Sequence, residues 1–135
     1  MVYVTRKAHF SASHRLYNPA WSDAKNDAVF GKCSNPHGHG HNYELEVTVV
    51  GKVPDDTGMV IDLKTLSDLV EQEIVEKVDH KHLNLDVDFL KGFVPTAENI
   101  AKAFWQILQP KITDGRLHSI KLFESENNFV EYRGE

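Results

Sequence analysis

The fold class is decided by the stretch Tyr43-Glu44-Leu45-Glu46-Val47-Thr48-Val49. Its apolar side chains alternate with polar ones, which is the pattern of a β-strand that buries one face and exposes the other. The segment His39-Gly40-His41-Asn42 leads directly into this strand, and we expect the strand to end near Gly51. The sequence therefore predicts a half-buried strand that carries two histidines at its start.

A second strand is expected over residues 2–14, where the alternation is looser. One face of this segment carries Ala8, Phe10, Ala12 and His14. Because neighbouring side chains of a strand point to opposite faces, these four residues share a side of the sheet. We expect this strand to pair with the one that contains Tyr43.

Two long helices are predicted in the second half of the chain. Asp62 is a suitable N-cap for the first, and Pro95-Thr96 marks the start of the second. A shorter helix, capped by Ser22 or Asp23, is expected before them. The apolar stripes of the long helices consist of Leu66, Leu69, Val70, Ile74 and Val78 in the first, and of Ile100, Ala101, Phe104, Ile107 and Leu108 in the second.

The last two apolar segments, residues 117–124 and 129–132, alternate again and are separated by Asn127-Asn128, which predicts a β-hairpin. The order is strand, strand, helix, helix, strand, strand. This order indicates an α+β domain with a four-stranded antiparallel sheet and two helices on one face. Such a sheet has exposed edges, and assembly with other chains would cover them.

The length and the net charge of the chain argue against several classes of protein. With 135 residues, we expect one compact domain over residues 1–135. The net charge is −5 and the basic residues are scattered, which argues against a nucleic-acid-binding protein. No apolar run approaches the ~20 residues of a membrane span, and the first residues do not resemble a secretory signal. We therefore expect a cytoplasmic protein, in which the single cysteine, Cys33, is a free thiol.

The histidines are the most informative residues, because five of the eight lie in the first third of the chain. His39 and His41 project to one face of an extended strand, and His14 on the paired strand can supply a third nitrogen. Three neutral imidazoles suit zinc and leave a fourth position for water or substrate, as in catalytic sites. Two alternatives stay open at this point: the histidines have a purely structural role, or Cys33 closes a four-ligand structural site.

Three further positions carry polar groups with two interpretations each. Asp79-His80 follows the first long helix. These residues either present catalytic groups in a loop or form a solvated helix end, and their spacing alone favours the helix end. Glu124 ends an apolar strand and either binds the guanidinium-like edge of a heterocycle or is an edge charge that prevents aggregation. Thr96 is an N-cap whose neighbouring amides are also placed to meet a ligand.

Several motifs together resemble the 6-pyruvoyltetrahydropterin synthase family over nearly the whole chain. They are Phe10-Ser11-Ala12-Ser13-His14-Arg15, Phe30-Gly31-Lys32-Cys33, His39-Gly40-His41-Asn42-Tyr43, Asp79-His80 and Phe123-Glu124, in the order of the family. The resemblance implies a tunnelling fold (T-fold) whose strands assemble into a trimeric barrel, with two trimers forming a hexamer. It also implies that the active sites lie between subunits.

The resemblance further implies a reaction: conversion of 7,8-dihydroneopterin triphosphate to 6-pyruvoyltetrahydropterin with loss of triphosphate. Zinc is then the cofactor, with the ligands His14, His39 and His41. The resemblance assigns proton transfer to Cys33, Asp79 and His80, and anchoring of the pterin ring to Glu124. Thr96, from its position at a helix start, is expected as a second substrate-binding residue. For the triphosphate, the candidates by proximity to the motifs are Arg15, Lys25 and Lys32.

His37 departs from the family pattern and creates a second His-Gly-His frame. Related 6-carboxytetrahydropterin synthases of queuosine biosynthesis have three residues between cysteine and the first histidine, which selects His37 and His39. The pyruvoyl type has five, which selects His39 and His41, and Asn42-Tyr43 favours this choice. In an extended strand all three histidines share a face, so geometry alone does not exclude His37. The alternative functions are the carboxy-type reaction, which releases acetaldehyde and triphosphate, and a non-catalytic zinc-stabilised module.

Overall fold

The computed structural model describes residues 1–135. The strands are β1 (Val2–His14), β2 (His39–Gly51), β3 (Lys81–His82), β4 (Arg116–Phe123) and β5 (Phe129–Tyr132), and the α-helices are α1 (Asp23–Phe30), α2 (Leu63–Val70), α3 (Glu76–Val78) and α4 (Ala97–Leu108). A π-helical segment, Glu71–Val75, joins α2 to α3 without a break, and short 3₁₀ turns span Gly31–Ser34, Asp88–Leu90 and Gln109–Lys111.

The sheet has the order β3-β1-β2-β4-β5. β1 and β2 pair antiparallel along their full lengths, from Val2 opposite Gly51 to His14 opposite His39. β2 also pairs with β4, and β4 forms the expected hairpin with β5. The predicted α+β class and the two paired N-terminal strands are therefore confirmed.

The prediction of four antiparallel strands is wrong, because β3 adds a fifth strand that runs parallel to β1. β3 has only two residues, which is too short to show an alternating pattern in the sequence. Backbone hydrogen bonds hold the segment: the N–H groups of His80 and Leu83 donate to the carbonyls of Ser11 and Ser13, both at 2.7 Å. These bonds attach the loop after α3 to β1, at the edge of the sheet.

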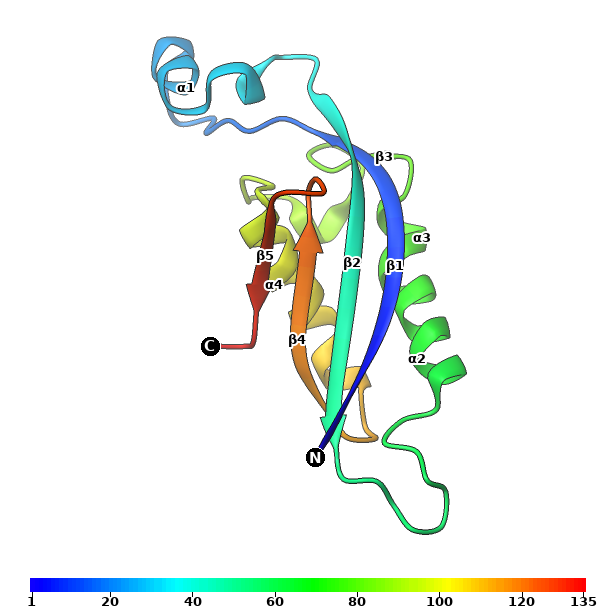
Figure 1. Cartoon of the computed structure of the whole chain (residues 1–135). Helices are drawn as coiled ribbons and strands as arrows, with labels where there is room; N and C mark the ends of the chain where they lie inside the picture. Colours follow the sequence, from blue (N-terminus) through cyan, green and yellow to red (C-terminus); the bar gives the residue numbers. More distant parts are fainter.

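The long helices cover one face of the sheet, as the sequence predicted. Figure 1 shows α4 behind β4 and β2, while α2 and α3 run beside β1. Apolar residues from both helices and from the sheet form one core cluster, including Phe10, Leu45, Leu66, Ile100 and Phe104. No helix of the structure is long and apolar enough to cross a membrane.

The predicted helix starts are confirmed by their capping bonds. Asp62 accepts a hydrogen bond from Lys64 N–H, and Thr96 accepts one from Asn99 N–H. Ser22, and not Asp23, caps α1 by accepting from Lys25 N–H. α1 contributes little to the core and stands beyond the end of the sheet, as an excursion between β1 and β2 (Figure 1).

Two leucines in α2 provide a matched test of this packing. Leu66 is fully buried, whereas Leu63 is 60% exposed. We expect Leu66→Ala to lower the free energy of unfolding by about 2–5 kcal/mol, because it removes buried methyl groups and leaves a cavity. Leu63→Ala should change it by less than about 1 kcal/mol. Urea denaturation monitored by circular dichroism measures both values, and equal losses would contradict the packing described.

Candidate functional site

Three imidazoles converge at the end of the sheet where β1 finishes and β2 begins. His14 lies opposite His39 in the β1–β2 register, and His41 lies opposite Ala12. One potential ligand atom from each histidine lies within 4.8 Å of the others. His14 Nε2 and His39 Nε2 are only 3.1 Å apart. The predicted set of three histidines is therefore brought together on the helix-covered face of the sheet.

His14 is the most constrained member of this cluster. Its side chain is completely buried, and its Nδ1 lies 2.8 Å from the carbonyl oxygen of Pro95. A carbonyl only accepts hydrogen bonds, so Nδ1 carries the proton and Nε2 keeps a lone pair directed at His39. The sequence does not reveal this role of Pro95, because Pro95-Thr96 indicates only a helix start.

The surroundings of two of these imidazoles, His14 and His41, favour the neutral form. Burial lowers the pKa of His14 to about 4, despite the opposing effect of the Pro95 carbonyl, and His39 and His41 lower it further. Burial also lowers the pKa of His41, although the charge of Glu124 opposes this shift. Neutral imidazole is the form that ligates metals, so the lowered pKa values of His14 and His41 favour metal binding at neutral pH.

The geometry fits a zinc ion. Tetrahedral zinc with bonds of about 2.0–2.1 Å separates its nitrogen ligands by about 3.3 Å, close to the spacing between His14 and His39. His41 Nε2 and His39 Nδ1 are buried and lack hydrogen-bond partners. Unpaired buried nitrogens are costly, and coordination of His41 Nε2 would remove one of them. Cys33 does not belong to this group.

Glu124 borders the cluster, one residue beyond the end of β4. Its Oε1 lies 3.6 Å from His41 Nε2, and its backbone N–H donates to Asn128 across the hairpin turn. Tyr43, buried beneath the cluster, has a raised pKa because of its burial and the negative charge of Glu124. The predicted pterin anchor and the predicted metal ligands are thus adjacent.

Asp79 and His80 form a separate dyad at the β1 edge. Asp79 Oδ1 accepts a 2.9 Å hydrogen bond from Ser11 N–H and lies 3.0 Å from His80 Nδ1. The Ser11 bond, followed by the contact with His80, lowers the pKa of Asp79. His80 has a φ of 60°, the one left-handed conformation outside glycine, and its ring is largely exposed. Such backbone strain is frequent at functional sites.

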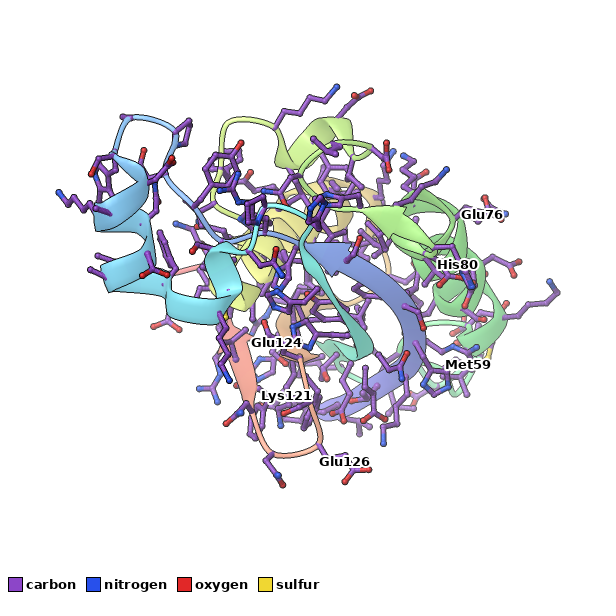
Figure 2. The ribbon with its side chains drawn as sticks, turned by 90° about the horizontal axis from the view of Figure 1, so that it is seen from above. Met59, Glu76, His80, Lys121, Glu124 and Glu126 are labelled. Atoms are coloured by element: carbon purple, nitrogen blue, oxygen red, sulfur yellow. The ribbon has the colours of Figure 1, made fainter.

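The dyad and Glu124 lie on different sides of the two long strands. Figure 2 shows His80 beside the green helices and Glu124 beside β4, with β1 and β2 between them. A hollow of about 380 Å³ lies between the dyad and the three-histidine cluster, and His41 and His80 both line it, together with Ser13, Lys81 and His82. His82 was not singled out in the sequence, although its Nδ1 is buried without a partner and its charge acts on His14.

The structure gives the two remaining site predictions different surroundings. Cys33 is partly buried in the turn after α1, where its carbonyl accepts from Leu16 N–H, and no hydrogen bond joins it to Asp79 or His80. Thr96 caps α4. It directly follows Pro95, whose backbone carbonyl contacts His14.

The idea that His37 shares an extended strand with His39 and His41 is wrong. The strand begins at His39, while His37 is exposed in a turn. Gly38 has a φ of 74°, and a Cβ at this position would come within 3.0 Å of the His14 carbonyl oxygen. This glycine turns the chain away from the strand, so His37 does not join the three-histidine cluster.

Two of the three predicted phosphate ligands already have partners in the chain. Arg15 donates from Nε to the Ser34 carbonyl, and its guanidinium lies over the Tyr17 ring. The Lys25 ammonium lies over the Trp21 ring at 4.2 Å. Lys32 is exposed beside Cys33. The structure thus leaves Lys32 as the most available of the three.

Comparison with known proteins gives one consistent result. Residues 3–135 match the family model of 6-pyruvoyl tetrahydropterin synthase. The human 6-pyruvoyl tetrahydrobiopterin synthase is 46% identical over 132 residues, which are 98% of this chain and 91% of that protein. The structure of the Caenorhabditis elegans 6-pyruvoyl tetrahydropterin synthase aligns with a TM-score of 0.94 at 38% identity, covering 99% of this chain and 96% of the other.

A more distant relative carries a different name. The 6-carboxy-5,6,7,8-tetrahydropterin synthase of Rickettsia bellii is 33% identical over 150 aligned residues, covering 97% of this chain and 99% of that protein. It is less similar than the human protein over a comparable share of the chain. The fold, the three-histidine cluster and these matches lead to one conclusion: the chain belongs to the 6-pyruvoyl tetrahydropterin synthase family.

Proposed function

We propose that this protein is a zinc-dependent lyase that converts 7,8-dihydroneopterin triphosphate to 6-pyruvoyltetrahydropterin with loss of triphosphate. The observation that carries this proposal is the convergence of three imidazoles beside a carboxylate. The three ligand atoms lie within 4.8 Å of one another, and Glu124 lies 3.6 Å from His41. The 46% identity with the human 6-pyruvoyl tetrahydrobiopterin synthase supports the same reaction.

His14, His39 and His41 would hold the zinc ion through their ring nitrogens. Three protein ligands leave one coordination position for a water molecule or the substrate. Zinc bound there supplies a Lewis acid that polarises and acidifies the hydroxyl groups of the substrate side chain. Glu124, beside His41, anchors the pterin ring by accepting hydrogen bonds from its guanidinium-like edge. Thr96 stands as a further substrate contact near the same end of the sheet.

The Asp79–His80 dyad is arranged for proton transfer. The Asp79 carboxylate accepts from His80 Nδ1, which fixes the imidazole so that Nε2 is free to take up or return a proton. Cys33 removes the substrate proton as a thiolate, and His80 returns one while triphosphate leaves. Oxidation of the substrate side chain is balanced by reduction of its pyrazine ring, so no external redox cofactor takes part.

Within one chain no hydrogen bond joins Cys33 to Asp79 or His80, as expected if a neighbouring subunit completes the site. We propose that the chain forms trimeric barrels that stack into a hexamer, with each site completed by a neighbouring subunit. The sheet is open within one chain, because β3 and β5 are its outermost strands and neither has a further strand beside it. Such edges present unpaired backbone groups that a second chain can cover.

The carboxy-type reaction is the second candidate function. It is supported by the 33% identity with the Rickettsia bellii 6-carboxy-5,6,7,8-tetrahydropterin synthase. Both reactions use the same substrate and the same metal, but they differ in the fate of the side chain. The exclusion of His37 from the cluster removes the His37–His39 frame that the carboxy-type spacing selects. We therefore give preference to the pyruvoyl product.

Zinc content tests the ligand set. After reconstitution with zinc and dialysis, we expect about one zinc per chain in the wild type, and less than about 0.1 in His39→Ala and His41→Ala, because two imidazoles bind far more weakly than three. His37→Ala is the matched control, since it removes a nearby exposed histidine. Mass spectrometry of the metal measures each value. Full zinc in His41→Ala, with loss in His37→Ala, would show that the other frame is correct.

Product analysis tests the reaction itself. Zinc-loaded protein incubated with 7,8-dihydroneopterin triphosphate should release triphosphate and form 6-pyruvoyltetrahydropterin, as identified by mass spectrometry. The Asp79→Asn variant should retain zinc but lose about 100-fold in kcat, because the orientation of His80 is lost. Acetaldehyde with the carboxy product would establish the alternative reaction. Absence of triphosphate release by the wild type would leave only a non-catalytic zinc module.

A further inference from the structure

The turn before α4 contacts the metal cluster at a single point. The Pro95 carbonyl oxygen lies 2.8 Å from His14 Nδ1, although the two residues are 81 positions apart in the sequence. Both residues are buried. The Tyr43 hydroxyl also approaches His14 Nδ1, but at 3.4 Å. The orientation of the His14 ring therefore depends mainly on where the Pro95 carbonyl points.

Asn99 holds the turn on both sides of Pro95. Its side-chain Nδ2 donates to the Val94 carbonyl at 2.9 Å, and its backbone N–H donates to Thr96 Oγ1 at 3.2 Å. Thr96 N–H also donates to the Val94 carbonyl, at 2.8 Å. The proline ring fixes φ of Pro95, so these bonds to its two neighbours determine the direction of its carbonyl.

The first two turns of α4, which carry Asn99, are packed firmly in the core. Asn99 is followed by Ile100 and Ala101, which are completely buried, and Phe104 on the next turn is buried as well. These residues dock α4 in the core against the sheet. Asn99 therefore links the Pro95 turn to a helix whose position is fixed by the core.

We propose that Asn99 is a positioning residue for the metal ligand His14, acting through Val94 and the Pro95 carbonyl. It fixes the tautomer of His14 with the proton on Nδ1 and directs Nε2 at the metal position. Partners of this kind typically change metal affinity 10- to 100-fold when they are removed. The inference rests on the proposed zinc site, and it concerns metal affinity, not the identity of the product.

The decisive variant is Asn99→Asp, which keeps the size of the side chain. The oxygen that replaces Nδ2 accepts hydrogen bonds and cannot donate to the Val94 carbonyl. An acidic residue in the first turn of a helix favours the helix, so a role limited to helix capping predicts an unchanged or more stable protein. The positioning role predicts that the zinc dissociation constant, measured by competition with a chromophoric chelator, rises about 10- to 100-fold.

Two comparisons keep the test specific. Asn99→Ala, which removes the donor without adding a charge, should raise the zinc dissociation constant in the same way. Ile107→Ala is the control, because Ile107 packs against the core from the far end of α4 without touching the turn. It should lower the thermal midpoint and leave the zinc dissociation constant within about twofold of wild type.

A metal-free measurement separates this inference from the proposed reaction. In nitrogen-15 NMR spectra, wild-type His14 should show a single neutral tautomer with the proton on Nδ1. In Asn99→Asp and Asn99→Ala, both neutral tautomers should be populated. An unchanged tautomer together with an unchanged zinc dissociation constant would overturn the inference, even if the variants lose stability. Failure of the wild type to release triphosphate would instead refute the proposed function.

Discussion

The antiparallel register between β1 and β2 is the constraint on which the site depends. It places His14 opposite His39 and His41 opposite Ala12, all on the face that the helices cover. Side chains alternate between faces, so a slip of one residue in either strand would separate His14 from the other two imidazoles. The buried apolar residues of both strands, such as Phe10 in β1 and Tyr43 in β2, oppose such a slip because it would expose them. The core thus specifies the metal site as well as the fold.

The position of the cluster has an electrostatic consequence. Burial holds the pKa of His14 at about 4 and lowers that of His41, so the imidazoles stay neutral and available as ligands over the physiological pH range. In the metal-free chain, this leaves buried nitrogens without partners, which opposes folding. A bound metal would offset that cost if the ring orientations are already correct, and the Pro95 carbonyl fixes the orientation of the His14 ring. Support for one ligand therefore comes from a turn that is distant in the sequence.

Much of this could be predicted from the sequence, because strong periodicity reports the long elements. The alternation around Tyr43 and the apolar stripe from Leu66 correctly indicated β2 and the helix that begins at α2, and the His39–His41 spacing indicated the cluster. The missing parts depend on contacts that no pattern encodes. β3 is held by bonds to Ser11 and Ser13, and the turn at Gly38 depends on a positive φ beside the His14 backbone.

The most direct test of this account is the X-ray absorption spectrum of zinc in the reconstituted wild-type protein. The account predicts three imidazole nitrogens and one oxygen, each at about 2.0–2.1 Å from the metal. Imidazole rings produce characteristic outer-shell scattering, so the number of histidines can be determined along with the distances. A sulfur ligand at about 2.3 Å would contradict it, because Cys33 would then close the site and leave no position for substrate.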